Sequence, residues 1–164
     1  MPALAVATSD LVRAANAAFP SATTEVAATL PVRAHVAYEV FADTGETPRW
    51  LSVIQAAHVL ARTADGRAAK VSFRAAFDRA TIGYVLHYDY WPEDLTVAWR
   101  STRGGSIRVE GEARFTPLSD RACLMTYRLT LDMPVAGDWL ERHYDGHAAS
   151  AVVGDFREHL RRCT

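Results

Sequence analysis

A long series of alternating segments between Gln55 and Met133 limits the possible folds of this chain more than any other feature. Val71, Phe73 and Ala75 alternate with polar residues, and five further segments repeat the pattern. A period of two residues is typical of β-strands that have one covered face and one solvated face. Short polar turns separate the segments, and Asp65-Gly66 predicts a two-residue hairpin turn. The series therefore predicts consecutive antiparallel strands of one sheet.

Segments on either side of this series complete the predicted fold. Thr24 to Val32 alternates as an edge strand, and the period then becomes helical, with Val36, Val40 and Phe41 on one apolar face, until Thr44-Gly45 interrupts it. A second short helix is predicted around Trp50, and a long helix from about residue 138 to residue 162 closes the chain. This order predicts an α+β fold in which a curved antiparallel sheet of about seven strands wraps around the C-terminal helix.

The first 22 residues are predicted to form a helical arm that precedes a domain of residues 23–164. A chain of 164 residues can form one core with room for an internal pocket. The arm could mediate the formation of a homodimer. Its sequence lacks the basic start of a signal peptide, and no segment approaches the roughly 20 apolar residues of a membrane span. We therefore expect a protein that is neither exported nor embedded in a membrane.

Charge and cysteine content narrow the expected partners. The 18 Lys and Arg residues are matched by 19 Asp and Glu residues, so no basic surplus is present to bind the phosphates of nucleic acid. Cys123 and Cys163 resemble neither a disulfide framework nor a zinc site. We expect a cytoplasmic protein with no nucleic-acid partner, no metal and no cofactor.

The covered faces of the strands and one face of the closing helix are predicted to enclose a cavity. Several alanines on these faces leave space, and buried tyrosine hydroxyls require partners that a ligand or water can supply. The alternative is that the large apolar residues simply fill a core. The predicted wall contains no acid or base. It consists of the ligand-binding candidates Phe73, Phe77, Tyr84, Leu86, Tyr88, Trp99, Phe115, Met125, Tyr127 and Leu129.

Most charged residues of the strands, such as His87 and Asp89, fall on the outer face, where a solvated ladder of ion pairs is expected. His143 and His147 are four residues apart on the closing helix and would share one side of it. They could ligate a metal, contact a ligand, act as acid or base, or form an ordinary helix face. Two ligands do not make a metal site. Both histidines are predicted to contact the ligand, and Tyr88 and His147 are the catalytic candidates.

The chain resembles the helix-grip superfamily, also called START-like or SRPBCC, over residues 24–162. Four local motifs carry the resemblance: Pro48-Arg49-Trp50, Val97-Ala98-Trp99-Arg100, the segment 109–115 and the segment 125–129. The superfamily includes START lipid-transfer domains, birch-pollen-allergen-like proteins, and bacterial polyketide cyclase/dehydrase and coenzyme-Q-binding proteins. The resemblance implies that Trp50 packs under the mouth of the sheet and that Glu46 and Arg49 border the way into the cavity.

Three functions are compatible with this resemblance. The first is the binding, and possible transport, of a hydrophobic small molecule such as a lipid, polyketide, isoprenoid or quinone. The second is a polyketide aromatase/cyclase-dehydratase-like activity; such enzymes place an arginine and tyrosines inside the cavity, and the inner face of this sheet offers only the tyrosines. The third is an interaction module whose cavity is filled by its own side chains.

Overall fold

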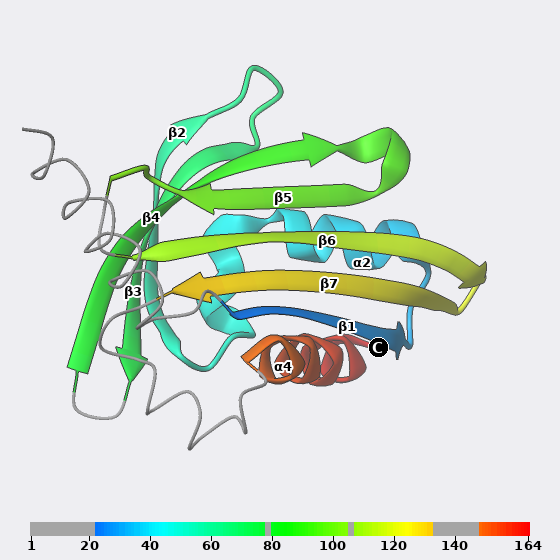
Figure 1. Cartoon of the computed structure of the whole chain (residues 1–164). Helices are drawn as coiled ribbons and strands as arrows, with labels where there is room; N and C mark the ends of the chain where they lie inside the picture. The colour runs from blue at the N-terminus through cyan, green and yellow to red at the C-terminus, as the bar shows by residue number, and fades with distance from the viewer. Residues whose placement is uncertain (1–21, 78–79, 105–106, 133–147) are drawn as a thin grey trace, which may run out of the picture.

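The computed structural model describes residues 22–77, 80–104, 107–132 and 148–164. In this part of the chain, seven strands form one antiparallel sheet in the order β1-β7-β6-β5-β4-β3-β2 (Figure 1). The strands are β1 (Ala22–Leu30), β2 (Ile54–Arg62), β3 (Ala68–Phe77), β4 (Ala80–Trp91), β5 (Thr96–Ser101), β6 (Arg108–Ser119) and β7 (Ala122–Asp132). The predicted helix-grip fold is confirmed.

Two α-helices pack on the concave face of this sheet. They are α2 (Ala34–Ala42) and α4 (Ala148–Cys163). Two short 3₁₀ helices complete the fold: η1 (Thr44–Arg49) connects α2 to β2, and η2 (Pro92–Asp94) connects β4 to β5. Figure 1 shows the strands curving around α2 and α4. The predicted start of the closing helix near residue 138 and the predicted arm at residues 1–21 lie outside the described residues. The domain boundary and the homodimer therefore stay predictions.

Helix α2 buries part of the predicted apolar face: Phe41 is buried and Val40 packs partly buried against the core, but Val36 does not. Its buried residues include Ala34, Ala37, Tyr38 and Phe41, which recur at helical spacing, whereas Val36 is 39% exposed. Valine is more apolar than alanine, so the sequence pattern placed Val36 on the buried face and left out Ala34 and Ala37. The two alanines allow the helix backbone to approach the sheet closely, and this close approach brings the larger rings of Tyr38 and Phe41 into the core.

Two local predictions before β3 were also inaccurate. The second short helix is η1, which ends before Trp50 and does not extend around it. The connection between β2 and β3 is a five-residue loop, 63–67, in place of a two-residue turn. The hydroxyl of Thr63 accepts a hydrogen bond from the backbone N–H of Arg67 at 3.0 Å, and Gly66 has a positive φ of 89°. In a tight turn, the backbone N–H at this position would bond to a backbone oxygen. Here the hydroxyl of Thr63 accepts the bond from the N–H of Arg67, and this stabilises the wider loop.

Helix α4 packs its apolar stripe against the sheet. Ala149, Val153, Phe156 and Leu160 are buried and recur at intervals of three and four residues. Phe156 lies 5.4 Å from Phe41 of α2, measured between ring centroids. The aromatic contacts therefore join the two helices inside the curve of the sheet.

The outer face carries the predicted ladder of ion pairs. Arg100 contacts Asp89 at 2.6 Å, and Arg128 contacts Glu112 at 3.6 Å, all on partly exposed side chains. His87 lies on this face beside Thr102, with a Nε2–Oγ1 distance of 3.3 Å. The alternation of the strands thus placed these charged residues correctly, away from the concave face.

Candidate functional site: a cavity between the sheet and the helices

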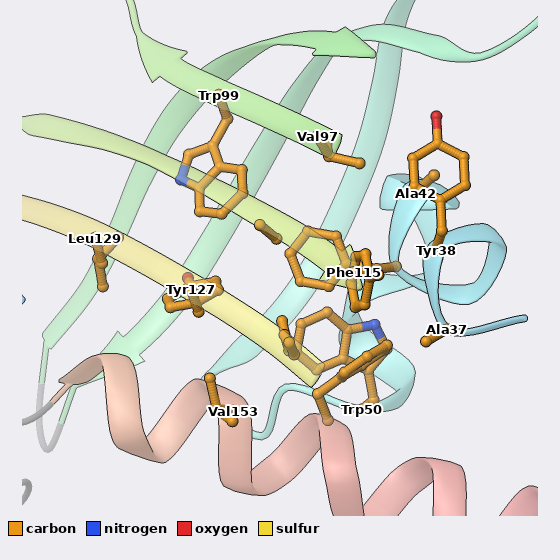
Figure 2. Packing of buried hydrophobic residues seen from close by; sticks show 14 of the residues in the cluster. Ala37, Tyr38, Ala42, Trp50, Val97, Trp99, Phe115, Tyr127, Leu129 and Val153 are labelled. Carbon is orange, nitrogen blue, oxygen red and sulfur yellow. The ribbon is translucent and has the colours of Figure 1, made fainter. Parts of the chain in front are cut away.

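A cavity of about 110 Å³ lies between the concave face of the sheet, η1 and α4. Figure 2 shows Trp99 of β5 and Tyr127 and Leu129 of β7 facing Val153 of α4, with Trp50 at the end of η1 on the same side. Trp50 is buried, lines the cavity and packs on Phe156 at 5.0 Å between ring centroids. This position agrees with the one that the resemblance implied for Trp50.

Many of the predicted wall residues meet at this cavity. Those that line it are Phe73, Tyr84, Leu86, Tyr88, Trp99, Tyr127 and Leu129. They come from β3, β4, β5 and β7 and lie together because the sheet curves. Their contact with a ligand stays a prediction.

Two predicted residues, Phe115 and Met125, belong to the core and do not line the cavity. The ring of Phe115 lies 5.8 Å from Phe41 and 6.2 Å from Phe156, measured between centroids. Side chains of α2 and α4 therefore fill the concave face at this end. The side chain of Phe77, together with His143 and His147, lies outside the described residues.

Trp99 forms part of the cavity wall because it lies over Gly111. The two residues are paired across β5 and β6, and a Cβ atom added to Gly111 would meet the indole of Trp99 and lie 2.6 Å from the backbone oxygen of Arg128. With no side chain at position 111, the indole crosses β6 and lies 5.4 Å from the ring of Tyr127 on β7. The glycine thus allows Trp99 to lie flat along the wall.

Three tyrosine hydroxyls of the wall have no hydrogen-bond partner among the described residues: those of Tyr84, Tyr88 and Tyr127. Burial away from water raises the pKa of each of these hydroxyls above its ordinary value. They therefore remain protonated and neutral, and each can donate or accept one hydrogen bond. The wall offers polar contacts without charge at these positions.

Tyr90 shows the contrasting case of a tyrosine with protein partners. Its hydroxyl donates to the backbone oxygen of Ala68 at 2.7 Å and lies 3.2 Å from the hydroxyl oxygen of Thr44. Arg67 lies over the ring of Tyr90 at 5.5 Å and pairs with Glu39 at 2.9 Å. Tyr90 is not among the residues that line the cavity, and its bonds hold η1 against β3 and β4.

The rim of the cavity carries an acid that the sequence reasoning missed. Asp155 of α4 is half-buried and lines the cavity, and its Oδ2 accepts hydrogen bonds from the backbone N–H of Ser52 at 3.2 Å and from its hydroxyl at 2.9 Å. Ala148, Ala151 and Val152 line the cavity from the same helix face. These four residues recur at helical spacing on one face. An acid within a stripe of small apolar residues is therefore the sequence pattern that could have predicted Asp155 at the cavity.

Other polar features predicted near the rim do not contribute to this cavity. Glu46 and Arg49 pair with each other at 2.9 Å on the surface, and neither lines the cavity.

Across the described ranges, no group of three His, Cys, Asp or Glu residues is arranged to hold a metal ion. No described helix is long and apolar enough to cross a membrane.

Comparisons with known proteins agree with this architecture. The chain is similar to a START superfamily protein from Mycobacterium smegmatis, with 16% identity and a TM-score of 0.74, over 87% of this chain and 99% of that one. It is also similar to the Zhui aromatase/cyclase of a Streptomyces species, with 15% identity and a TM-score of 0.70, over 86% and 94% of the two chains. At these identities the likeness concerns the fold alone.

Comparison of the sequence with curated proteins finds no match. In contrast, the model of the family described as polyketide cyclase / dehydrase and lipid transport matches residues 21–164, which is most of the chain. The chain therefore belongs to the polyketide cyclase / dehydrase and lipid transport family.

Proposed function

We propose that this protein binds a hydrophobic small molecule, of the lipid, polyketide, isoprenoid or quinone class, in the cavity between the sheet and α4. The observation that carries the proposal is an apolar, aromatic cavity whose tyrosine hydroxyls lack protein partners among the described residues. Apolar walls with a few placed polar groups are typical of small-molecule sites. The walls supply affinity through burial, and the hydroxyls supply orientation.

The size of the cavity limits what can be fully enclosed. An apolar cavity of about 150 Å³ takes up benzene, so the cavity of about 110 Å³ suits roughly one ring or a short branched alkyl group. A larger ligand of the proposed classes would place one such group inside and extend past the rim near Asp155. The tyrosines of the wall would then contact the enclosed group.

The first test is native mass spectrometry of the purified protein, followed by organic extraction of any bound compound. Titration with toluene, followed by tryptophan fluorescence, is the second test, because Trp50 and Trp99, two of the four tryptophans of the chain, line the cavity. A stoichiometric apolar compound, or saturable toluene binding, would support the proposal. Unchanged fluorescence and an empty protein would contradict it.

A matched pair of variants locates the binding. Ala151→Leu adds three carbons at a position that lines the cavity, whereas Ser150→Leu adds a leucine to the exposed face of the same helix. Leucine and alanine both favour helices, so α4 should keep its structure. We expect Ala151→Leu to abolish toluene binding and Ser150→Leu to leave it unchanged. Equal binding by both variants would mean that toluene binds elsewhere.

The second candidate function is a polyketide cyclase/dehydratase-like enzyme, which the presence of Asp155 in the same cavity as protonated tyrosines favours. Aldol closure transfers a proton from carbon to a base and another to the carbonyl oxygen, and the following loss of water needs a donor. Asp155 is the candidate base and Tyr88 the candidate donor, while His147, the other candidate from the sequence, lies outside the described residues. Turnover of a poly-β-ketone mimic that Tyr88→Phe and Asp155→Asn both abolish would support this activity. Binding without turnover would support the binder.

A further inference from the structure

One residue sets the charge of that part of the cavity wall which the structure describes. Among the described residues that line the cavity, Asp155 alone carries a full charge, and the remaining polar side-chain groups are hydroxyls and the indole N–H groups of Trp50 and Trp99. The ion pairs of the described arginines, such as Arg49 with Glu46 and Arg100 with Asp89, lie elsewhere on the surface. No described cation is therefore placed to hold an anionic ligand in the cavity.

The carboxylate of Asp155 also has capacity left for a ligand. Both hydrogen bonds from Ser52 reach the same oxygen, Oδ2, and Asp155 forms no ion pair with another described residue. An ionised carboxylate accepts several hydrogen bonds and donates none. Ser52 holds the carboxylate through Oδ2, and Oδ1 has no hydrogen-bond partner among the described residues.

A carboxylate in this position discriminates between ligands by charge. A ligand carboxylate beside Asp155 would place two like charges next to apolar walls, where water screens them poorly. A hydroxyl or ammonium group at the same place would donate to Oδ1, and bonds to an ionised acceptor are stronger than neutral ones. The wall hydroxyls remain neutral and so do not offset this preference.

We propose that the cavity selects ligands that combine an apolar ring or alkyl group with a hydrogen-bond donor and that carry no negative charge, with Oδ1 of Asp155 as the acceptor. This inference rests on the proposed function, since it requires the cavity to bind an apolar group. It adds that free carboxylates, such as simple fatty acids, are poor ligands of this protein. It also makes Asp155 the residue that determines specificity at the rim.

Four compounds with the same ring and one substituent carbon test the inference: toluene, benzyl alcohol, benzylamine and benzoate. At neutral pH benzylamine is a cation and benzoate an anion. We expect wild-type protein to bind benzylamine at least about tenfold more tightly than benzoate, the factor that one charge-assisted hydrogen bond supplies. Benzyl alcohol should lie between them. Calorimetric titration of each compound gives the affinities.

Variants of the same helix separate the role of Asp155 from that of net charge. Asp155→Asn should reduce the ratio of benzylamine to benzoate affinity by about tenfold, because it removes the charge and keeps an acceptor for Ser52. Glu158→Gln removes an exposed charge that pairs with Arg161 and does not line the cavity, so it should leave the ratio unchanged. Ser52→Ala keeps the carboxylate and should also keep the preference.

Three outcomes would overturn the inference. The inference is overturned, without any variant, if the wild-type protein binds benzoate as tightly as benzylamine. An unchanged ratio in Asp155→Asn, or an equal fall in Glu158→Gln, would assign the preference to another group or to overall charge. If toluene also fails to bind and the purified protein carries no apolar compound, the proposed function itself fails, which a loss of charge preference alone would not imply.

Discussion

Replacing Gly111 by alanine tests the packing that forms the wall of the cavity. The new Cβ would lie 2.5 Å from Cε2 of Trp99 and 2.6 Å from the backbone oxygen of Arg128, far closer than ordinary contact. The oxygen belongs to the paired strand β7 and has little freedom to move, so the indole of Trp99 must shift. That indole is surrounded by the rings of Phe41, Tyr88 and Tyr127 at centroid distances of 5.4–6.4 Å.

Overpacking of a core costs about 1–3 kcal/mol, and the upper end applies here because one of the two obstacles is backbone. We therefore expect Gly111→Ala to lower the free energy of unfolding by about 3 kcal/mol, or the Tm by roughly 6–12 °C for a chain of this size. Displacement of Trp99 should also change the tryptophan emission and weaken toluene binding. Calorimetry or urea unfolding, with fluorescence, measures all three effects.

Gly83→Ala is the matched control, since Gly83 also lies in the sheet. A Cβ at this position would have the backbone oxygen of Phe73 as its nearest neighbour at 3.8 Å, an ordinary contact. A glycine replaced by alanine without strain gains about 0.4–1 kcal/mol through the unfolded chain. Gly83→Ala should therefore be neutral or stabilising. Equal stability of the two variants would refute the packing of Trp99 on Gly111.

Two further predictions concern titratable groups of the core. Burial raises the pKa of Tyr127 above its ordinary value of 10.0, so above pH 10 the unfolded chain loses this proton before the folded one, and stability falls as the pH rises. The urea midpoint should decline above pH 10, and less steeply in Tyr127→Phe; an identical slope would contradict the burial of this hydroxyl. Burial also raises the pKa of the Cys123 thiol to about 11, whereas Cys163 is exposed. At pH 8 a thiol reagent should modify Cys163 quickly and Cys123 only in denaturant, and equal rates in the folded protein would refute this.

The sequence determined the sheet and the two faces of its strands. Alternation with a period of two is a local property, and it correctly assigned Phe73 and Tyr127 to the concave face and Asp89 to the solvated face. The order of the elements then limited the fold, because consecutive antiparallel strands with a closing helix have few arrangements. These features depend on neighbouring residues along the chain, so they could be predicted without coordinates.

The tertiary structure decided which of these residues form a site. Phe115 and Tyr127 share the concave face, but helix side chains fill the space beside Phe115 and leave the cavity beside Tyr127. The rotation of α4 about its axis brings Asp155 to the rim, where it meets Ser52 from a distant part of the chain. Position along the sequence carries no information on such contacts. These contacts depend on how closely two elements pack. The alanines of α2 and Gly111 allow close packing, but only after the sheet has curved around the helices.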